Sequence, residues 1–210
     1  MKVWEHKVVT PSMAMQWSAK QISQWQKVQK YKLTTGDASR RSKQDVTNYW
    51  KAPEPGKLKI NVDASVHAGT SSFALGMVLR DQNGGFCKAK CSRHEGEVTV
   101  FEAEAFGVVE ALKWIMELGI MNVELESDSL LTVQAVNRGV INFLEVGNLI
   151  NESRLMMIGR PDIDLVFVKK QANRVAHSLA RVSCEVNCFI EFESPPPSVL
   201  ENIMYDVFLI

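Results

Sequence analysis

The feature that most constrains the fold of this chain is a change of hydrophobic period near residue 100. Three successive segments between residues 58 and 92 are typical of β-strands: apolar and polar residues alternate over 58–64, large apolar residues recur at every second position over 73–79, and a third strand is expected over 86–92. From residue 101 to residue 118, apolar residues recur every three or four positions, which is the pattern of an amphipathic helix. Strands followed by a long helix predict a mixed α/β layer and exclude a repeat array.

The later part of the chain continues this alternation of strands and helices. The turn sequence Asp-Gln-Asn-Gly-Gly at 81–85 predicts a hairpin, because Asn and Gly accept the positive φ that the turn needs. Gly119 is expected to end the long helix. A crossover helix precedes the fourth strand, so this strand should run parallel to its neighbour. The predicted strands are 58–64, 73–79, 86–92, 123–128 and 163–168, and the predicted helices are 101–118, 130–137, 144–157 and 173–183.

The charge of the chain is divided unevenly. The whole chain is formally neutral, but residues 1–50 hold nine Lys or Arg and three acids, which gives them a formal charge of +6. The remainder therefore carries −6. A basic arm on an acidic body suits an arm that contacts phosphate and a body that holds cations, although a solvated tail has the same composition.

Three segments are predicted from these patterns: an N-terminal arm and linker with most of the tryptophans (1–50), a globular domain (51–184) and a C-terminal tail (185–210). The first thirty residues lack the apolar core of a secretory signal. The apolar runs are far shorter than the roughly 20 residues of a membrane span. We therefore expect an intracellular protein, in the nucleus or cytoplasm, that is monomeric and has no membrane partner.

Three acidic residues fall on three different predicted elements. Asp63 lies in the first strand, Glu104 in the first turn of the long helix, and Asp128 at the end of the fourth strand. If the first and fourth strands are parallel neighbours, these carboxylates can converge at one switch point of the sheet. Converging carboxylates repel one another unless a hard cation such as Mg²⁺ or Mn²⁺ binds them. Two such ions about 4 Å apart can activate water for attack on a phosphodiester.

Each acid also has a simpler interpretation. Glu104 could be an N-terminal acid that the helix dipole favours. Asp128 could be the N-cap of the helix that follows it. Spacing alone leaves both interpretations open.

Five segments of the chain, in order, carry a resemblance that favours the metal site. They lie at residues 50–64, 76–84, 103–119, 123–129 and 168–180, and the last reads Val-Lys-Lys-Gln-Ala-Asn-Arg-Val-Ala-His-Ser-Leu-Ala. Together they resemble the type 1 ribonuclease H domain, in the divergent form found in plant non-LTR retroelements and in genes derived from them. The resemblance covers residues 50–206. It implies an α/β fold of the ribonuclease H type, with a five-stranded mixed sheet (three antiparallel strands, then two parallel) flanked by helices.

The resemblance also implies a site and a reaction. Asp63, Glu104 and Asp128 match the metal-binding carboxylates of the family, and the register favours Glu104 over Glu102. His177 stands where better-studied members carry a fourth acid, and their His-containing loop before this helix is missing here. The implied reaction is hydrolysis of the RNA strand of an RNA–DNA hybrid, with Mg²⁺ as the cofactor and Mn²⁺ as an alternative. The implied partner is the hybrid or another nucleic acid.

Six polar residues are candidate substrate contacts. Backbone or 2′-hydroxyl contacts are expected from Asn61, Ser65, Ser127 and Ser129, and phosphate contacts from Lys169 and Lys170. Ordinary structural roles would explain the same residues. The two departures from the family pattern leave open a second function: a weakened or inactive domesticated ribonuclease H fold that binds nucleic acid or protein without cutting.

Overall fold

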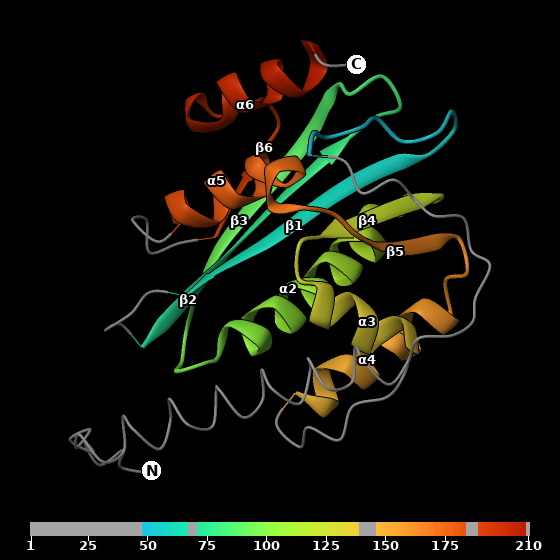
Figure 1. Cartoon of the computed structure of the whole chain (residues 1–210), viewed down its shortest axis with the longest axis vertical. Helices are drawn as coiled ribbons and strands as arrows, with labels where there is room; N and C mark the ends of the chain where they lie inside the picture. The colour runs from blue at the N-terminus through green and yellow to red at the C-terminus, as the bar shows by residue number, and fades with distance from the viewer. Residues whose placement is uncertain (1–47, 67–70, 139–145, 184–188, 209–210) are drawn as a thin grey trace. The chain divides into compact units, whose positions relative to one another are not determined.

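Six strands form one mixed sheet in the computed structural model, which describes residues 48–66, 71–138, 146–183 and 189–208. The strands are β1 (Leu58–Val66), β2 (Ser72–Arg80), β3 (Phe86–Glu95), β4 (Val123–Ser127), β5 (Ile163–Phe167) and β6 (Ile190–Phe192). The helices are α2 (Val100–Leu118), α3 (Leu130–Arg138), α4 (Gly147–Ile158), α5 (Arg174–Ser183) and α6 (Pro197–Phe208), with a short 3₁₀ turn, η1 (Lys170–Ala172), before α5. Figure 1 shows this arrangement.

The order of the strands is β5-β4-β1-β2-β3-β6. Strands β1, β2 and β3 are antiparallel, whereas β4 is parallel to β1 and β5 is parallel to β4. The predicted mixed α/β sheet is therefore confirmed. The parallel strands β1, β4 and β5 consequently point their carboxyl ends toward the same edge of the sheet, which we call the carboxyl edge.

The predicted number of five strands is wrong by one. Strand β6 pairs antiparallel with the outer edge of β3 and extends the sheet. It contains only three residues, Ile190–Phe192, which is too short for an alternating pattern to be recognised in the sequence. Its pairing depends on the long-range contact with β3.

Helices cover both faces of the sheet (Figure 1). Helix α2 packs on β1 and β2, and α3 and α4 lie on the same side. Helix α5 packs on β1, β2 and β3 on the other side, with α6 against it. Residues 45–210 form one compact unit, so the C-terminal helix packs within the same body as the sheet. None of the described helices is long and apolar enough to cross a lipid bilayer.

Gly76 allows α5 to approach the sheet closely. A Cβ atom at this position would collide with the backbone O of Ala176 and the backbone N of Ala180. Gly76 pairs with Asp63 across β1 and β2. The missing side chain thus brings α5, with His177 in its first half, directly over the strand that carries Asp63.

Candidate active site

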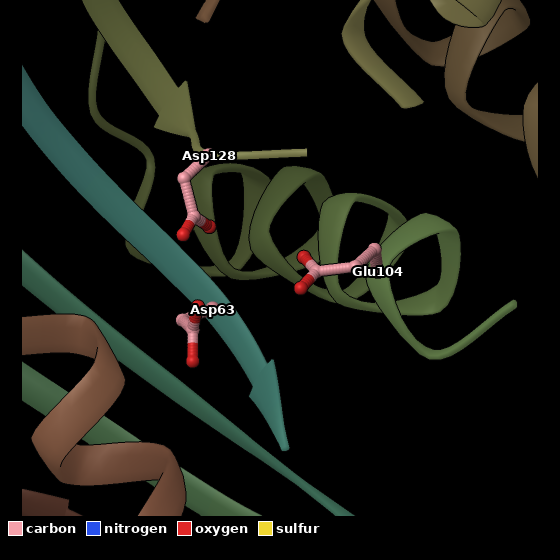
Figure 2. Close-up of side chains that lie close together, drawn as sticks. All are labelled: Asp63, Glu104 and Asp128. Atoms are coloured by element: carbon pink, nitrogen blue, oxygen red, sulfur yellow. The ribbon is translucent and has the colours of Figure 1, made fainter. Parts of the chain in front are cut away.

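Asp63, Glu104 and Asp128 come together at the carboxyl edge. One carboxylate oxygen from each lies within 4.8 Å of the other two, and the three side chains come from β1, α2 and the residue after β4 (Figure 2). The register explains the convergence, because Val62 pairs with Ser127 in the neighbouring parallel strand. The residues that follow them, Asp63 and Asp128, are therefore at the same level.

Glu102, not Glu104, is the acid that caps the helix. The Thr99 side chain accepts a hydrogen bond from Glu102 N at 3.2 Å, and Glu102 Oε2 accepts one from Thr99 N at 2.6 Å. This reciprocal capping box satisfies the first backbone donors of α2. Glu104 lies two residues later, outside the first turn, so its expected place in that turn is wrong. Its carboxylate is directed at Asp63 and Asp128 instead (Figure 2).

Asp128 is not required to cap the next helix. Ser129 Oγ accepts a hydrogen bond from Thr132 N at 3.4 Å and lies 2.7 Å from the Thr132 hydroxyl. Ser127 Oγ accepts a hydrogen bond from Ser129 N at 3.1 Å. The two serines thus organise the start of α3, and the Asp128 carboxylate is left for the site.

The electrostatics of the three carboxylates fit a cation-binding site. Burial, together with the charges of Asp63 and Asp128, raises the pKa of Glu104 well above its usual range. Burial, together with the nearby Asp63 carboxylate, raises the pKa of Asp128 to about 6. Among the described residues, the buried Glu104 Oε2 has no hydrogen-bond partner. An all-oxygen acceptor set that is buried, mutually repulsive and partly unsatisfied fits a hard divalent cation such as Mg²⁺ or Mn²⁺.

Asp63 and Asp128 each accept a hydrogen bond from a residue in α5 or directly before it. His177 Nδ1 donates a hydrogen bond to Asp63 Oδ2 at 3.0 Å. Asn173 Nδ2 donates to Val62 O at 2.9 Å and to Asp128 Oδ1 at 3.2 Å. Asn173 therefore ties the two parallel strands together beneath the carboxylates.

Asn173 was not among the residues predicted for the site. The available signal was its place four residues before His177, at the start of the same predicted helix. Its backbone O accepts a hydrogen bond from His177 N at 3.0 Å, so the two residues are adjacent on one turn.

The six candidate substrate contacts divide into two groups. Asn61 and Ser127 are fully buried, and their polar side-chain atoms are bound within the protein, so the structure gives them internal roles. Ser65, Ser129 and Lys169 are partly exposed, and Lys170 is exposed. The charge of Lys170 lowers the pKa of Glu104, against the larger effect of burial, so this lysine is near the carboxylates. These four residues remain candidate contacts.

Several proteins with known sequences or structures are similar to this chain. A curated Arabidopsis thaliana protein named "Putative ribonuclease H protein" is 27% identical over 158 residues, which are 75% of this chain and 25% of the relative. This chain thus spans about a quarter of that relative's length. RNase H1 from Halobacterium salinarum superimposes with a TM-score of 0.57 at 22% identity, over 62% of this chain and 98% of the other. LC11-RNase H1, in a crystal structure with an RNA/DNA hybrid, gives 0.54 at 21% identity, over 61% and 96%.

The fold and these likenesses define a ribonuclease H-like domain. A family model described as "Reverse transcriptase-like" matches residues 61–183, more than half of the chain, and the chain belongs to this family.

Proposed function

We propose that this protein is a metal-dependent ribonuclease H that hydrolyses the RNA strand of RNA–DNA hybrids. The observation that carries the proposal is the convergence of one oxygen each from Asp63, Glu104 and Asp128 within 4.8 Å of one another, at the end of parallel strands. A divalent metal bound there would activate a water molecule and stabilise the leaving oxygen of the phosphodiester. The family and the hybrid bound by one similar structure support the choice of substrate.

The residues of the chain have distinct parts in this reaction. The carboxylates of Asp63, Glu104 and Asp128 provide the negative charge that holds the metal. Hydrolysis joins the oxygen of water to phosphorus, breaks the bond from phosphorus to the 3′ oxygen of the RNA and leaves a 5′-phosphate. Lys170, exposed beside the carboxylates, is placed to contact a phosphate of the substrate.

His177 is a positioning residue in this proposal. An imidazole that donates Nδ1–H to Asp63 Oδ2 fixes the orientation of that carboxylate without adding a negative charge to the site. The fourth family carboxylate would bring one more repulsive charge, so its replacement by His177 leaves a site with three acids.

Cleavage of a strand-labelled RNA–DNA hybrid tests the function. The wild-type chain is expected to cut only the RNA strand in Mg²⁺ or Mn²⁺. Asp63→Asn should lower the rate by about a thousandfold or more, because several kcal/mol of transition-state stabilisation are lost with the metal.

Glu102→Gln is the matched control on the neighbouring helix. Glutamine can still bond the backbone at the helix start, so the capping box is kept and the cleavage rate should stay near that of the wild type. If the wild-type chain binds the hybrid but cuts neither strand in either metal, the enzymatic proposal is wrong and the non-cutting binding module replaces it.

A further inference from the structure

Helix α5 begins beside the three carboxylates, and its first residue contacts α6. Asn173, directly before α5, donates to Asp128 Oδ1 at 3.2 Å. Arg174 comes next, and its guanidinium carbon lies 4.7 Å from the centre of the Tyr205 ring on α6, the helix that packs against α5 (Figure 1). Arg174 Nε also donates to the backbone O of Gln171 at 3.1 Å. The guanidinium is thus held next to a tyrosine that is 48% exposed, one residue from a contact with the carboxylate site.

A second exposed tyrosine lies on the same side of the domain. Tyr49, in the segment before β1, is 43% exposed. The residues that directly follow the two tyrosines, Trp50 and Asp206, both contact the buried guanidinium of Arg80. Its carbon lies 3.6 Å from the centre of the Trp50 ring, and its Nη1 donates to Asp206 Oδ2 at 2.7 Å. Tyr49 and Tyr205 therefore flank the same buried arginine.

Cations without an acidic partner border the two rings. Lys51 Nζ lies 5.7 Å from the centre of the Tyr49 ring. Lys169 Nζ donates to Asn48 Oδ1, directly before Tyr49, at 2.9 Å. Lys170, the next residue, lies near the carboxylates. Among the described residues, eight other Lys and Arg side chains form ion pairs with acids, whereas none of the bordering cations does: Lys51, Lys169, Lys170 and Arg174.

Exposed rings beside unpaired cations match the chemistry of a single nucleic-acid strand. The bases of a duplex stack on one another, whereas unpaired bases stack on aromatic side chains while nearby cations bind the phosphates. Both tyrosines lie outside residues 61–183, which the family model matches. This combination of rings and cations is therefore an addition to the family domain.

We propose that Tyr49, Tyr205 and the four bordering cations, which we call the tyrosine surface, bind an unpaired nucleic-acid strand that continues from the duplex in the carboxylate site. The two rings stack on its bases, and the cations contact its phosphates. The identity of that duplex, an RNA–DNA hybrid, rests on the proposed function. Every base has a face that can stack, so the tyrosine surface adds affinity without reading sequence.

The tyrosine surface is tested by the binding of hybrids that differ only at their ends. One labelled RNA–DNA hybrid has blunt ends, and four others each carry about eight unpaired nucleotides on one strand end. Binding to the full-length protein is measured by fluorescence anisotropy with a chelator present, so that no metal-dependent cleavage occurs. Tyr49→Leu/Tyr205→Leu removes both rings and keeps apolar side chains. The matched control, Tyr49→Phe/Tyr205→Phe, keeps both rings.

The wild type should bind at least one extended hybrid at least about tenfold more tightly than the blunt hybrid. The leucine variant should lose this preference and bind the blunt hybrid as the wild type does. The phenylalanine variant should keep the preference, because stacking needs the ring and not the hydroxyl group.

Arg174→Gln tests the cations independently of the rings. This variant should bind the preferred extended hybrid more weakly and leave the affinity for the blunt hybrid unchanged. The slope of log affinity against log salt should fall by about 0.7 for the extended hybrid, which corresponds to one lost phosphate contact on a single strand. Lys88→Gln removes a cation that pairs with Glu193 and should change neither value.

Equal affinity of the wild type for the blunt and all four extended hybrids would overturn the tyrosine surface. So would a wild type that binds no hybrid, or a leucine variant that keeps the preference or binds the blunt hybrid equally weakly. Failure of the cleavage assay is a separate result, because binding is measured without metal. A chain that prefers an extended hybrid but cuts neither strand refutes the proposed hydrolysis and leaves the tyrosine surface standing. A chain that cuts the RNA strand without this preference does the reverse.

Discussion

Two clusters of buried charge lie next to each other on the same two strands, and they are stabilised in opposite ways. The catalytic cluster consists of Asp63, Glu104 and Asp128. The second cluster, which we call the compensated network, lies nearer the amino ends of the same strands, β1 and β4. It consists of Trp50, Lys59, Asn61, Arg80, Glu126 and Asp206. Its charges are paired with one another.

The first half of the compensated network joins β1 to β4. Lys59 Nζ lies 2.6 Å from Glu126 Oε1 and 2.7 Å from Glu124 Oε1. Asn61 Nδ2 donates to Glu126 Oε2 at 2.7 Å. Burial raises the pKa of Glu126 to about 7 although Lys59 opposes this effect. The lysine and the amide thus offset part of the cost of burying this acid.

The second half joins Trp50, which precedes β1, and α6 to the sheet. Arg80 Nη1 donates to Asp206 Oδ2 at 2.7 Å, and Nη2 donates to Asn61 Oδ1 at 2.9 Å. The guanidinium carbon lies 3.6 Å from the centre of the Trp50 ring. Arg80 is fully buried, and it connects three segments that are far apart in the sequence.

In the catalytic cluster, no Lys or Arg of the described residues forms an ion pair with any of the three carboxylates, and His177 is the one basic side chain paired with them. The comparison indicates different purposes. Where burial of charge serves stability, the chain supplies its own cations. Where no Lys or Arg is paired with the carboxylates at a strand end, we propose that a cation from solution binds them. Perturbed groups at such a position are typical of functional sites.

The largest effect on stability is expected from breaking the compensated network at Arg80. Arg80→Met leaves the Asp206 carboxylate buried without its cation and should lower the free energy of unfolding by about 3 to 5 kcal/mol. Urea denaturation measures the change. The double variant Arg80→Met/Asp206→Leu removes both charges and should recover most of the loss. If the single variant costs less than about 1 kcal/mol, the pair does not hold α6 on the sheet.

A smaller gain in stability is expected from metal binding at the catalytic cluster. At a concentration of 100 times the Kd, Mg²⁺ should raise the free energy of unfolding by about 2.7 kcal/mol, because it binds the folded chain. The gain should diminish as the pH falls through about 6, since Asp128 must lose its proton to bind metal and its pKa is raised to about 6. Thermal unfolding with and without chelator measures it. Asp63→Asn should remove the gain, and a gain that survives in this variant would place the metal elsewhere.

The two clusters also differ in how far they could be predicted from the sequence. Local periodicity predicted β1, β4 and α2, and three acids on or beside them, Asp63, Glu104 and Asp128, became candidates. The resemblance to ribonuclease H then favoured this set, with Glu104 rather than Glu102. Their convergence depends on the parallel pairing of β1 with β4, which a crossover helix between them already favours.

The compensated network could not be predicted in the same way. Asn61 was expected to contact the backbone or a 2′-hydroxyl of the substrate. In the structure its side chain is buried and bonded to Trp50, Arg80 and Glu126. Arg80 in turn meets Asp206, which is 126 residues away in the sequence. A local sequence pattern cannot predict a contact between residues so far apart in the chain. Asp206 reaches Arg80 because α6 packs against α5.

The smallest predicted effect is a gain in stability for Asp128→Asn in the absence of metal. This variant tests whether the catalytic cluster destabilises the fold when no metal is bound. The pKa of Asp128 rises from an ordinary 3.8 to about 6 on folding, so the folded state disfavours its ionised form at neutral pH. After allowance for its partial exposure, the asparagine variant should unfold with a free energy about 1 to 2 kcal/mol higher at pH 7. The gain should vanish well below pH 3.8, where the carboxyl is protonated in both states, grow as the pH rises from about 4 to about 6, and stay constant at higher pH.

Asp164→Asn, an exposed aspartate on β5, is the control and should change stability by less than about 0.5 kcal/mol. Added Mg²⁺ should make the wild type more stable than Asp128→Asn, since the three carboxylates of the wild type bind the ion more tightly than the variant does. If Asp128→Asn is instead less stable than the wild type in chelator at pH 7, the hydrogen bond from Asn173 to Asp128 outweighs the repulsion. The catalytic cluster would then be as well compensated as its neighbour, and the contrast on which the metal site rests would be lost.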